Sequence, residues 1–230
     1  MSLPIHNFYT TIKQEKSDQT DYPNFDKMNI KLPFRALLCG PSGSGKTNVV
    51  LNLLKGINAF DQIILLAKNL GEILYKHLID VYQKIEKRHG RQLILPISDI
   101  KDLPPVKECD PKKNTLLIID DMICENAKDL AKVSEYFIRG RKNNVSMCFL
   151  TQSYFDTPKM VRKNVNYVII KKIGNPMDLK RILKEWSLGV TVEELQEIYD
   201  SYMEGGDMTR FFMIDLETNK PQLRFRRNFG

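Results

Sequence analysis

The chain has 230 residues, of which 42% are hydrophobic, and this is enough to build one sizeable core. Lysine and arginine outnumber aspartate and glutamate by 35 to 28, so the formal net charge is +7. This composition excludes a collagen, a coiled coil, a wholly disordered chain and a disulfide-stapled miniprotein. The four cysteines are far apart, which is typical of free thiols in a reducing compartment. No apolar run approaches the roughly 18 residues that cross a bilayer, and the N-terminus lacks the apolar stretch of a secretion signal, so we expect an intracellular protein with no membrane partner.

The first elements in chain order surround a glycine-rich loop. Residues 1–30 are polar and are expected to form an N-terminal arm. A buried strand at 33–39 runs into the loop, and a helix at 48–55 follows it. Further strands are predicted at 62–67, 115–120, 145–151 and 167–171, while the type of the segment 92–97 is left open. Further helices are predicted at 70–88, 125–139 and 156–164.

Short apolar strands that alternate with helices predict an α/β fold, with a mostly parallel sheet covered by helices on both faces. We expect this core to occupy residues 31–175. Residues 176–230 are expected to be appended to it as two helices and a β-hairpin. These elements are predicted at 177–186, 192–203, 211–216 and 223–227.

The glycine-rich loop matches the phosphate-binding P-loop pattern in full. Its residues are Gly40, Pro41, Ser42, Gly43, Ser44, Gly45, Lys46 and Thr47. The glycines let backbone N–H groups curl around phosphate oxygens, and the N-terminus of the following helix favours an anion. In this pattern Lys46 reaches the β- and γ-phosphates and the Thr47 hydroxyl ligates Mg²⁺. The loop therefore predicts a nucleotide site with a bound magnesium ion.

Two adjacent carboxylates, Asp120 and Asp121, end the strand predicted at 115–120. The carboxyl ends of the strands face the ligand crevice in an open α/β sheet. One carboxylate there can hold Mg²⁺ through water, and its neighbour can orient the attacking water as a general base. The alternative is a solvated turn, but two adjacent carboxylates repel each other unless a cation lies between them.

Other polar residues follow the helix at 125–139 and the strand at 145–151. Gln152 comes directly after that strand, where an amide can touch the γ-phosphate or the attacking water. Arg139 and Arg141 lie between the helix and the strand, and an arginine given across a subunit boundary can stabilise the transition state. A solvated basic turn or a contact to a nucleic-acid phosphate is the alternative for both arginines.

Three segments carry a family resemblance: PFRALLCGPSGSGKT, LLIIDDM and RGRKNNVSMCFLTQSY. In this order and spacing, over about residues 33–171, the chain resembles the FtsK–HerA superfamily. More narrowly, it resembles the poxvirus-type genome-packaging ATPases of large DNA viruses and virophages. The resemblance implies a RecA-like P-loop NTPase in which the strand before Gln152 lies between the P-loop strand and the Asp120 strand.

The resemblance also implies an activity and a setting. It implies ATP as substrate and Mg²⁺ as cofactor. It also implies a homo-oligomeric ring that translocates double-stranded DNA into a capsid, with a capsid component at a packaging vertex as partner. The implied location is the virus factory in the host cytoplasm, with association with the virion as a further option.

The roles of individual residues follow from the same resemblance. Lys46 and Thr47 match the Walker A pair, Asp120 the Mg²⁺-associated carboxylate, Asp121 the catalytic carboxylate, Gln152 the sensor glutamine, and either Arg139 or Arg141 the arginine finger. Many members of the superfamily have glutamate where Asp121 stands. Aspartate is one methylene shorter than glutamate, so Asp121 departs from the common pattern of the superfamily at this position.

The charge is unevenly distributed along the C-terminal third. Residues 159–184 hold eight basic residues and a single acidic one, residues 185–217 reverse this bias, and the tail 220–227 is basic again. Such blocks are either solvated faces, a polyanion-binding surface or a subunit contact. We expect DNA phosphates to be contacted by Lys171, Lys172, Lys180 and Arg181.

Three other functions stay open at this point. A HerA-like helicase or DNA pump in replication or repair has nearly the same sequence features. A P-loop kinase for a small metabolite needs an arginine-rich lid and an acceptor pocket, and has no need of paired aspartates. A nucleotide-dependent switch or scaffold has no need of the second carboxylate, Asp121.

Overall fold

A computed structural model describes residues 20–122 and 126–230. The strands in these ranges are β1 (Arg35–Cys39), β2 (Gln62–Ala67), β3 (Ile94–Ile97), β4 (Thr115–Asp120), β5 (Val145–Thr151), β6 (Tyr167–Ile170), β7 (Phe212–Asp215) and β8 (Phe225–Arg227). They form one sheet in the order β3-β2-β4-β5-β1-β6-β7-β8. Strands β1 to β6 are parallel, whereas β7 is antiparallel to β6 and β8 is antiparallel to β7. The predicted mostly parallel sheet is therefore confirmed.

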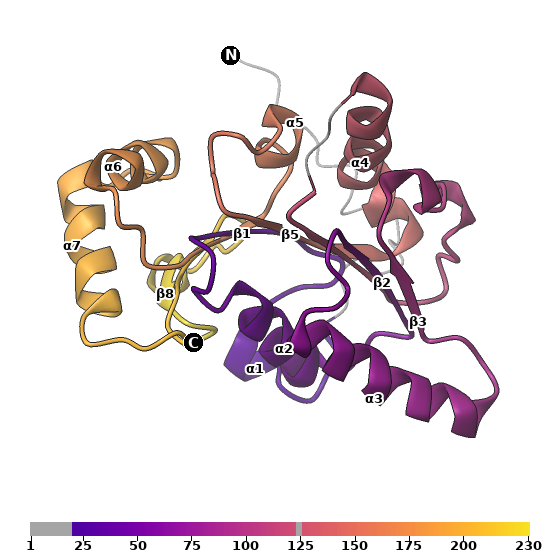
Figure 1. Ribbon diagram of the computed structural model, residues 1–230. Coiled ribbons are helices and arrows are strands. Elements are labelled where there is room, and N and C mark those ends of the chain that lie inside the picture. Colours follow the sequence, from indigo (N-terminus) through magenta and orange to yellow (C-terminus); the bar gives the residue numbers. More distant parts are fainter. Residues whose placement is uncertain (1–19, 123–125) are drawn as a thin grey trace, which may run out of the picture.

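Helices cover both faces of this sheet (Figure 1). Their bounds are α1 (Phe25–Met28), α2 (Lys46–Ile57), α3 (Ile73–His89), α4 (Ala127–Arg139), α5 (Lys159–Arg162), α6 (Pro176–Glu185) and α7 (Val192–Met203). Helices α1, α2 and α3 lie on one face, and α4 and α5 lie on the other. Helices α6 and α7 lie at the β6–β8 end, where their apolar residues join the same core as α4. Glu125, where the helix before Arg139 was expected to begin, lies outside the described residues.

Alternate residues of each strand supply two separate cores. In β1, Leu37 and Cys39 pack in the core beneath α4, whereas Ala36 and Leu38 pack in the core beneath α2 and α3. All residues of β4 before Asp120 are buried. Burial on both faces is the physical reason for the continuous apolar runs that predicted these strands.

Two segments refine the sequence expectations. The segment 92–97 contains β3, which is the edge strand of the described sheet and pairs with β2. Pro96 is tolerated there because an edge strand leaves one side unpaired. The helix predicted at 156–164 is only the single turn α5, because Pro158 disfavours the helical conformation for the residue before it. The predicted terminal hairpin is confirmed as the antiparallel pair β7 and β8.

The described part of the expected N-terminal arm packs against the core. Tyr22 and Met28 are buried, and the Tyr22 hydroxyl donates a 2.6 Å hydrogen bond to the carbonyl of Ile30. The Asn24 amide donates to the carbonyl of Gly56 on α2. Residues 1–19 lie outside the described range. The boundaries at residues 30 and 175 stay predictions, and strands β7 and β8 extend the same sheet as β1 to β6.

Three strands end at one edge of the sheet and position the candidate site. Strand β5 lies between β1 and β4, with Cys39 beside Thr151 and Asp120 beside Leu150. This is the strand order that the resemblance implied. The loop 40–47, the two aspartates and Gln152 therefore leave the sheet side by side.

Candidate functional site

The P-loop joins β1 to α2 and is shaped by two glycines in the left-handed region. Gly43 has a φ of 69° and Gly45 a φ of 88°, which glycine adopts without steric strain. Helix α2 has no side-chain cap, so the first N–H groups of the helix remain directed at the loop. The buried hydroxyl of Ser44 has no hydrogen-bond partner among the described residues. These groups make a cradle of donors that suits a phosphate.

Lys46 is buried at the first position of α2. Its ammonium group donates hydrogen bonds of 2.8 and 3.1 Å to the carbonyl oxygens of Gly40 and Pro41. Burial lowers the pKa of Lys46, and the negative charge of Asp120 opposes this shift. A buried ammonium whose hydrogen bonds go to neutral carbonyls gains strongly from an anion, so its position suits a phosphate oxygen.

Asp120 lies at the tip of β4 and accepts a 2.5 Å hydrogen bond from the hydroxyl of Tyr75 on α3. Burial raises the pKa of Tyr75, and the neighbouring Thr47 side chain acts in the opposite direction. Burial raises the pKa of Asp120, while the bond from Tyr75 and the charge of Lys46 lower it. Tyr75 therefore holds Asp120, one of the two predicted magnesium ligands, and has the other, Thr47, as a neighbour.

These two side chains fit a hard cation. Oxygen donors are what Mg²⁺ prefers, and it commonly takes only one or two protein ligands beside substrate phosphates and water. The described residues contain no cluster of three or more His, Cys, Asp or Glu side chains that could hold a metal on their own.

Asp121 follows β4 with a φ of 51°, in the left-handed region, and its side chain is exposed. The Gln152 amide donates a 3.0 Å hydrogen bond to the Asp121 carboxylate. The structure therefore brings together the residues predicted as base and sensor, although they are 31 positions apart in the chain. Their exposure on the cavity wall leaves both side chains accessible to water.

A cavity of about 630 Å³ unites these residues. Most of the P-loop lines it, together with Asp120, Asp121 and Gln152. Sequence reasoning missed the remaining lining residues, which are Asn48, Ala67, Lys68, Asn69, Glu72, Leu74, Met208 and Thr209. It also missed Tyr75, which no motif marks and whose inward direction depends on the packing of α3 against the sheet.

Lys171 corrects one expectation. It was predicted to contact DNA, but its side chain is buried and its ammonium donates to the carbonyl oxygens of Met208 and Arg210. Burial lowers the pKa of Lys171 to about 8. The loop that it anchors lies against the P-loop, since a Cβ atom on Gly45 would lie 2.4 Å from the Met208 carbonyl oxygen. Lys171 therefore supports the cavity wall rather than an outer surface.

The basic residues of the C-terminal tail 220–227 do not all lie on the surface. Arg226 is buried and forms a 3.2 Å ion pair with Asp215. The same guanidinium donates to the carbonyl oxygens of Met28 and Phe229, so it fixes the chain end to the body of the protein. Arg227 remains exposed.

Arg139 and Arg141 lie far from the P-loop of their own subunit. Arg139 ends α4 and Arg141 follows in a 3₁₀ turn before β5, at the amino edge of the parallel strands. Near them Arg35, the first residue of β1, donates to the Phe137 carbonyl. Burial lowers the pKa of Arg35, and the nearby charge of Arg141 acts in the same direction. The cavity lined by the P-loop lies at the opposite, carboxyl edge.

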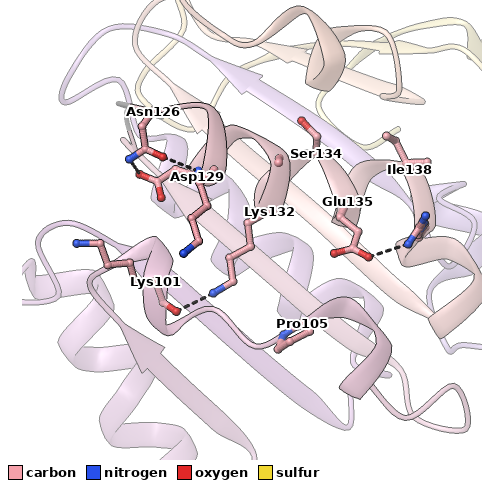
Figure 2. A pocket seen from close by; sticks show the side chains of 11 residues that line it. Lys101, Pro105, Asn126, Asp129, Lys132, Ser134, Glu135 and Ile138 are labelled. Carbon is pink, nitrogen blue, oxygen red and sulfur yellow. Dashed lines mark hydrogen bonds and ion pairs between the residues drawn. The ribbon is translucent and has the colours of Figure 1, made fainter.

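Arg139 instead lines a different hollow, of about 810 Å³, along the outer face of α4 (Figure 2). The Arg139 guanidinium forms a 3.0 Å ion pair with the Glu135 carboxylate. Across the hollow, the Lys132 ammonium donates to the Lys101 carbonyl, which ties α4 to the loop before β4. The structure therefore does not bring the two arginines to the predicted catalytic carboxylates within one chain.

The fold and the site together define a P-loop NTPase fold. The glycine-rich loop follows β1, and a carboxylate pair ends β4, two places away in the sheet. The chain belongs to the poxvirus A32 protein family, whose sequence profile matches residues 23–214.

Relatives with curated names match a smaller part of the chain. The DNA packaging protein OPG160 of variola virus is 28% identical over 144 residues, which are 60% of this chain and 53% of the relative. The DNA packaging protein OPG160 of vaccinia virus (strain Western Reserve) is 28% identical over 150 residues, 62% of this chain and 55% of the relative. The chain thus spans about half the length of these relatives.

Solved structures share the fold. The genome packaging NTPase B204 from Sulfolobus turreted icosahedral virus 2, in complex with AMPPCP, has a TM-score of 0.58 at 15% identity, over 85% of this chain and 97% of that chain. The same protein in complex with sulfate has a TM-score of 0.57 at 16% identity, over 86% of this chain and 97% of that chain.

The helices of residues 20–122 and 126–230 include none with the length and hydropathy needed to cross a bilayer.

Proposed function

We propose that this chain is the ATP-hydrolysing subunit of a motor that translocates double-stranded DNA, and that its task is to package a viral genome into a capsid. One observation carries the proposal: Lys46, Asp120 and the Asp121–Gln152 pair line one cavity in a member of the poxvirus A32 family. The relatives' printed name, DNA packaging protein, supports the choice of task.

The P-loop binds the phosphates of ATP. The Lys46 ammonium exchanges its carbonyl partners for β- and γ-phosphate oxygens, and the N–H groups at the start of α2 receive the others. The structural neighbour B204 has been solved in complex with the nucleotide analogue AMPPCP. We extend nucleotide binding from that protein to the present chain as part of the proposal.

Thr47 and Asp120 hold Mg²⁺, and Tyr75 fixes the Asp120 carboxylate by its hydrogen bond. When bound, the ion neutralises charge that develops on the phosphates. Because the Tyr75 hydroxyl donates to Asp120, that carboxylate is already oriented before the nucleotide arrives.

Asp121 acts as general base. It takes a proton from a water molecule whose oxygen forms a bond to the γ-phosphorus, while the bond from that phosphorus to the β–γ bridging oxygen breaks. Gln152 fixes the orientation of the carboxylate through the 3.0 Å hydrogen bond.

We propose a homo-oligomeric ring in which either Arg139 or Arg141 acts on a neighbour's nucleotide. Both arginines lie at the sheet edge opposite to their own P-loop, so an action on ATP requires a second subunit. An arginine supplied in trans stabilises the charge of the transferred phosphoryl group.

Exposed basic residues near α6 form the proposed DNA contact. Lys172 is exposed, Lys180 pairs with Glu193 at 3.1 Å, and the Arg181 guanidinium lies 4.0 Å from the centre of the Phe155 ring. Phosphate contacts by such residues tolerate any sequence, which suits a motor that must pass a whole genome. The capsid component at the packaging vertex and the location in the host cytoplasm belong to the same proposal.

Phosphate release from Mg·ATP tests this function against its rivals. The full chain should release phosphate without a small acceptor molecule, and duplex DNA should increase the rate. A rate that depends on a small hydroxylated acceptor and is indifferent to DNA supports a kinase and contradicts the proposal. ATP-dependent strand separation would favour the helicase alternative.

A further inference from the structure

A second, smaller hollow adjoins the cavity of the P-loop, on the side away from the two aspartates. It measures about 180 Å³ and shares Asn48 and Thr209 with the cavity that holds the P-loop. Its lining residues are Asn48, Val49, Asn52, Thr209, Phe211, Asn228 and Phe229. They come from α2, from the loop before β7 and from the end of the chain. No motif of the sequence marks this combination of residues.

The position of this hollow fits the nucleoside end of the substrate. The two aspartates lie on the β4 side of β1, whereas Phe211 and Asn228 flank β7 and β8 on the other side of β1. If the γ-phosphate lies beside Asp121, the phosphate chain runs across the P-loop towards Asn48 and Thr209. The base and ribose then arrive at the second hollow.

The lining has the chemistry that a planar, polar-edged group requires. The Phe229 ring is half-buried and packs edge-to-face against Phe211, with the ring centres 4.8 Å apart. Asn228 uses its side-chain oxygen to accept the N–H of Phe211, which leaves its amide NH₂ as donor for a ligand. Asn52 lies exposed on α2 and donates to the carbonyl of Asn48. An aromatic face with amide groups beside it is a typical site for a nucleobase.

The chain end is held rigidly enough to serve as a binding wall. Arg226 forms the buried ion pair with Asp215 and also donates a 2.7 Å hydrogen bond to the Phe229 carbonyl. Asn228 has a φ of 58°, a left-handed turn that asparagine tolerates and that places Phe229 back against the body. A pre-ordered aromatic side chain loses little entropy when a ligand stacks on it.

We propose that Asn48, Asn52, Thr209, Asn228 and Phe229 form the nucleoside subsite, which binds the purine base and ribose of the nucleoside triphosphate. This inference rests on the proposed nucleotide-binding function. The base stacks on Phe229, and the amide and hydroxyl groups contact its edge and the ribose.

Equilibrium binding of ATP and of inorganic tripolyphosphate separates this subsite from the phosphate site. Phe229→Ala should weaken ATP binding about 5- to 150-fold, the effect of one lost base–aromatic stack, and should leave tripolyphosphate binding within about twofold. Phe229→Tyr should restore ATP binding. Phe60→Ala, a partly buried phenylalanine of the same core that does not line the hollow, is the matched control.

A second variant guards against misfolding of the first. Asn52 and Thr209 are both exposed, so Asn52→Ala combined with Thr209→Val should fold normally and should again weaken ATP selectively. Equal losses for ATP and tripolyphosphate in that variant, or no loss of ATP affinity in either variant, would overturn the subsite. Equal affinity of the wild type for both ligands would also overturn it. If the wild type binds neither ligand, the proposed nucleotide-binding function itself fails.

Discussion

The Gln152 amide lies 3.0 Å from the Asp121 carboxylate and donates a hydrogen bond to it, so the tips of β5 and β4 are joined in the wall of the cavity that the P-loop lines. The same cavity contains the buried Lys46 ammonium and the Asp120 carboxylate held by Tyr75. Each group therefore has a separate expected role in binding, metal retention or hydrolysis, and each role can be tested on its own.

Asp121→Asn should keep Mg·ATP binding and lower turnover by ~10²-fold or more, because the general base is lost. Asparagine tolerates the left-handed backbone at this position, so the fold should be preserved. Asp120→Asn should instead raise the Mg²⁺ concentration needed for half-maximal hydrolysis. Magnesium titrations of phosphate release measure both effects, and an exchange of the two behaviours would reverse the assigned roles.

Lys46→Ala should abolish nucleotide binding or turnover, because it removes the charge that faces the phosphates. Lys55→Ala is the matched control, since Lys55 lies exposed in the last turn of the same helix. Equilibrium nucleotide binding and phosphate release measure the outcome. Near-normal hydrolysis by a folded Lys46→Ala protein would contradict the P-loop assignment.

Lys171→Met should lower the free energy of unfolding by about 1–3 kcal/mol, because the carbonyls of Met208 and Arg210 lose their shared donor. The neighbouring Lys172 is exposed, and Lys172→Met should change stability by less than about 0.5 kcal/mol. Chemical denaturation of the two variants measures this difference. Equal stability of the two would contradict the anchoring role.

The stability effect of Lys171 should also depend on pH. The pKa is about 8 in the folded protein, against 10.5 for an ordinary lysine, because burial disfavours the ammonium form. Between these pH values the unfolded chain keeps a proton that the folded chain has lost. The stability of the wild type relative to Lys171→Met should therefore rise with pH across this window. A fall over the same range would contradict the direction of the shift.

Much of the site could be predicted from the sequence because its parts are local. The P-loop needs only a strand, a glycine-rich loop and a helix in succession, and Asp120 and Asp121 directly follow an apolar strand. Parallel strands bring their carboxyl ends to one edge, so Gln152 was also expected nearby.

Other contacts depend on packing between distant segments. Tyr75 reaches Asp120 only because α3 packs against the sheet, and Lys171 is buried only because the loop at Met208 returns over β6. A lysine at the end of a strand has the same sequence signal whether it faces DNA or a carbonyl. The burial of Arg226 depends in the same way on Asp215 and on the N-terminal segment.

Mixing two inactive proteins tests the arginines. Lys46→Ala and Arg139→Ala/Arg141→Ala should each be inactive alone and should partly recover hydrolysis when combined. The first subunit still donates its arginines and the second still binds ATP, and an arginine in trans contributes ~10³-fold or more. Native mass must show that the two proteins assemble together. If a mixed assembly recovers nothing, the arginines do not act across subunits.

Displacement of the third strand from a DNA triplex tests the central claim most directly, because it reports movement along an intact duplex. The full chain with Mg·ATP should release the third strand while the duplex strands stay paired, and Asp121→Asn should release none. Vigorous ATP hydrolysis without release of the third strand, or release that proceeds equally without ATP, would contradict a DNA-translocating motor.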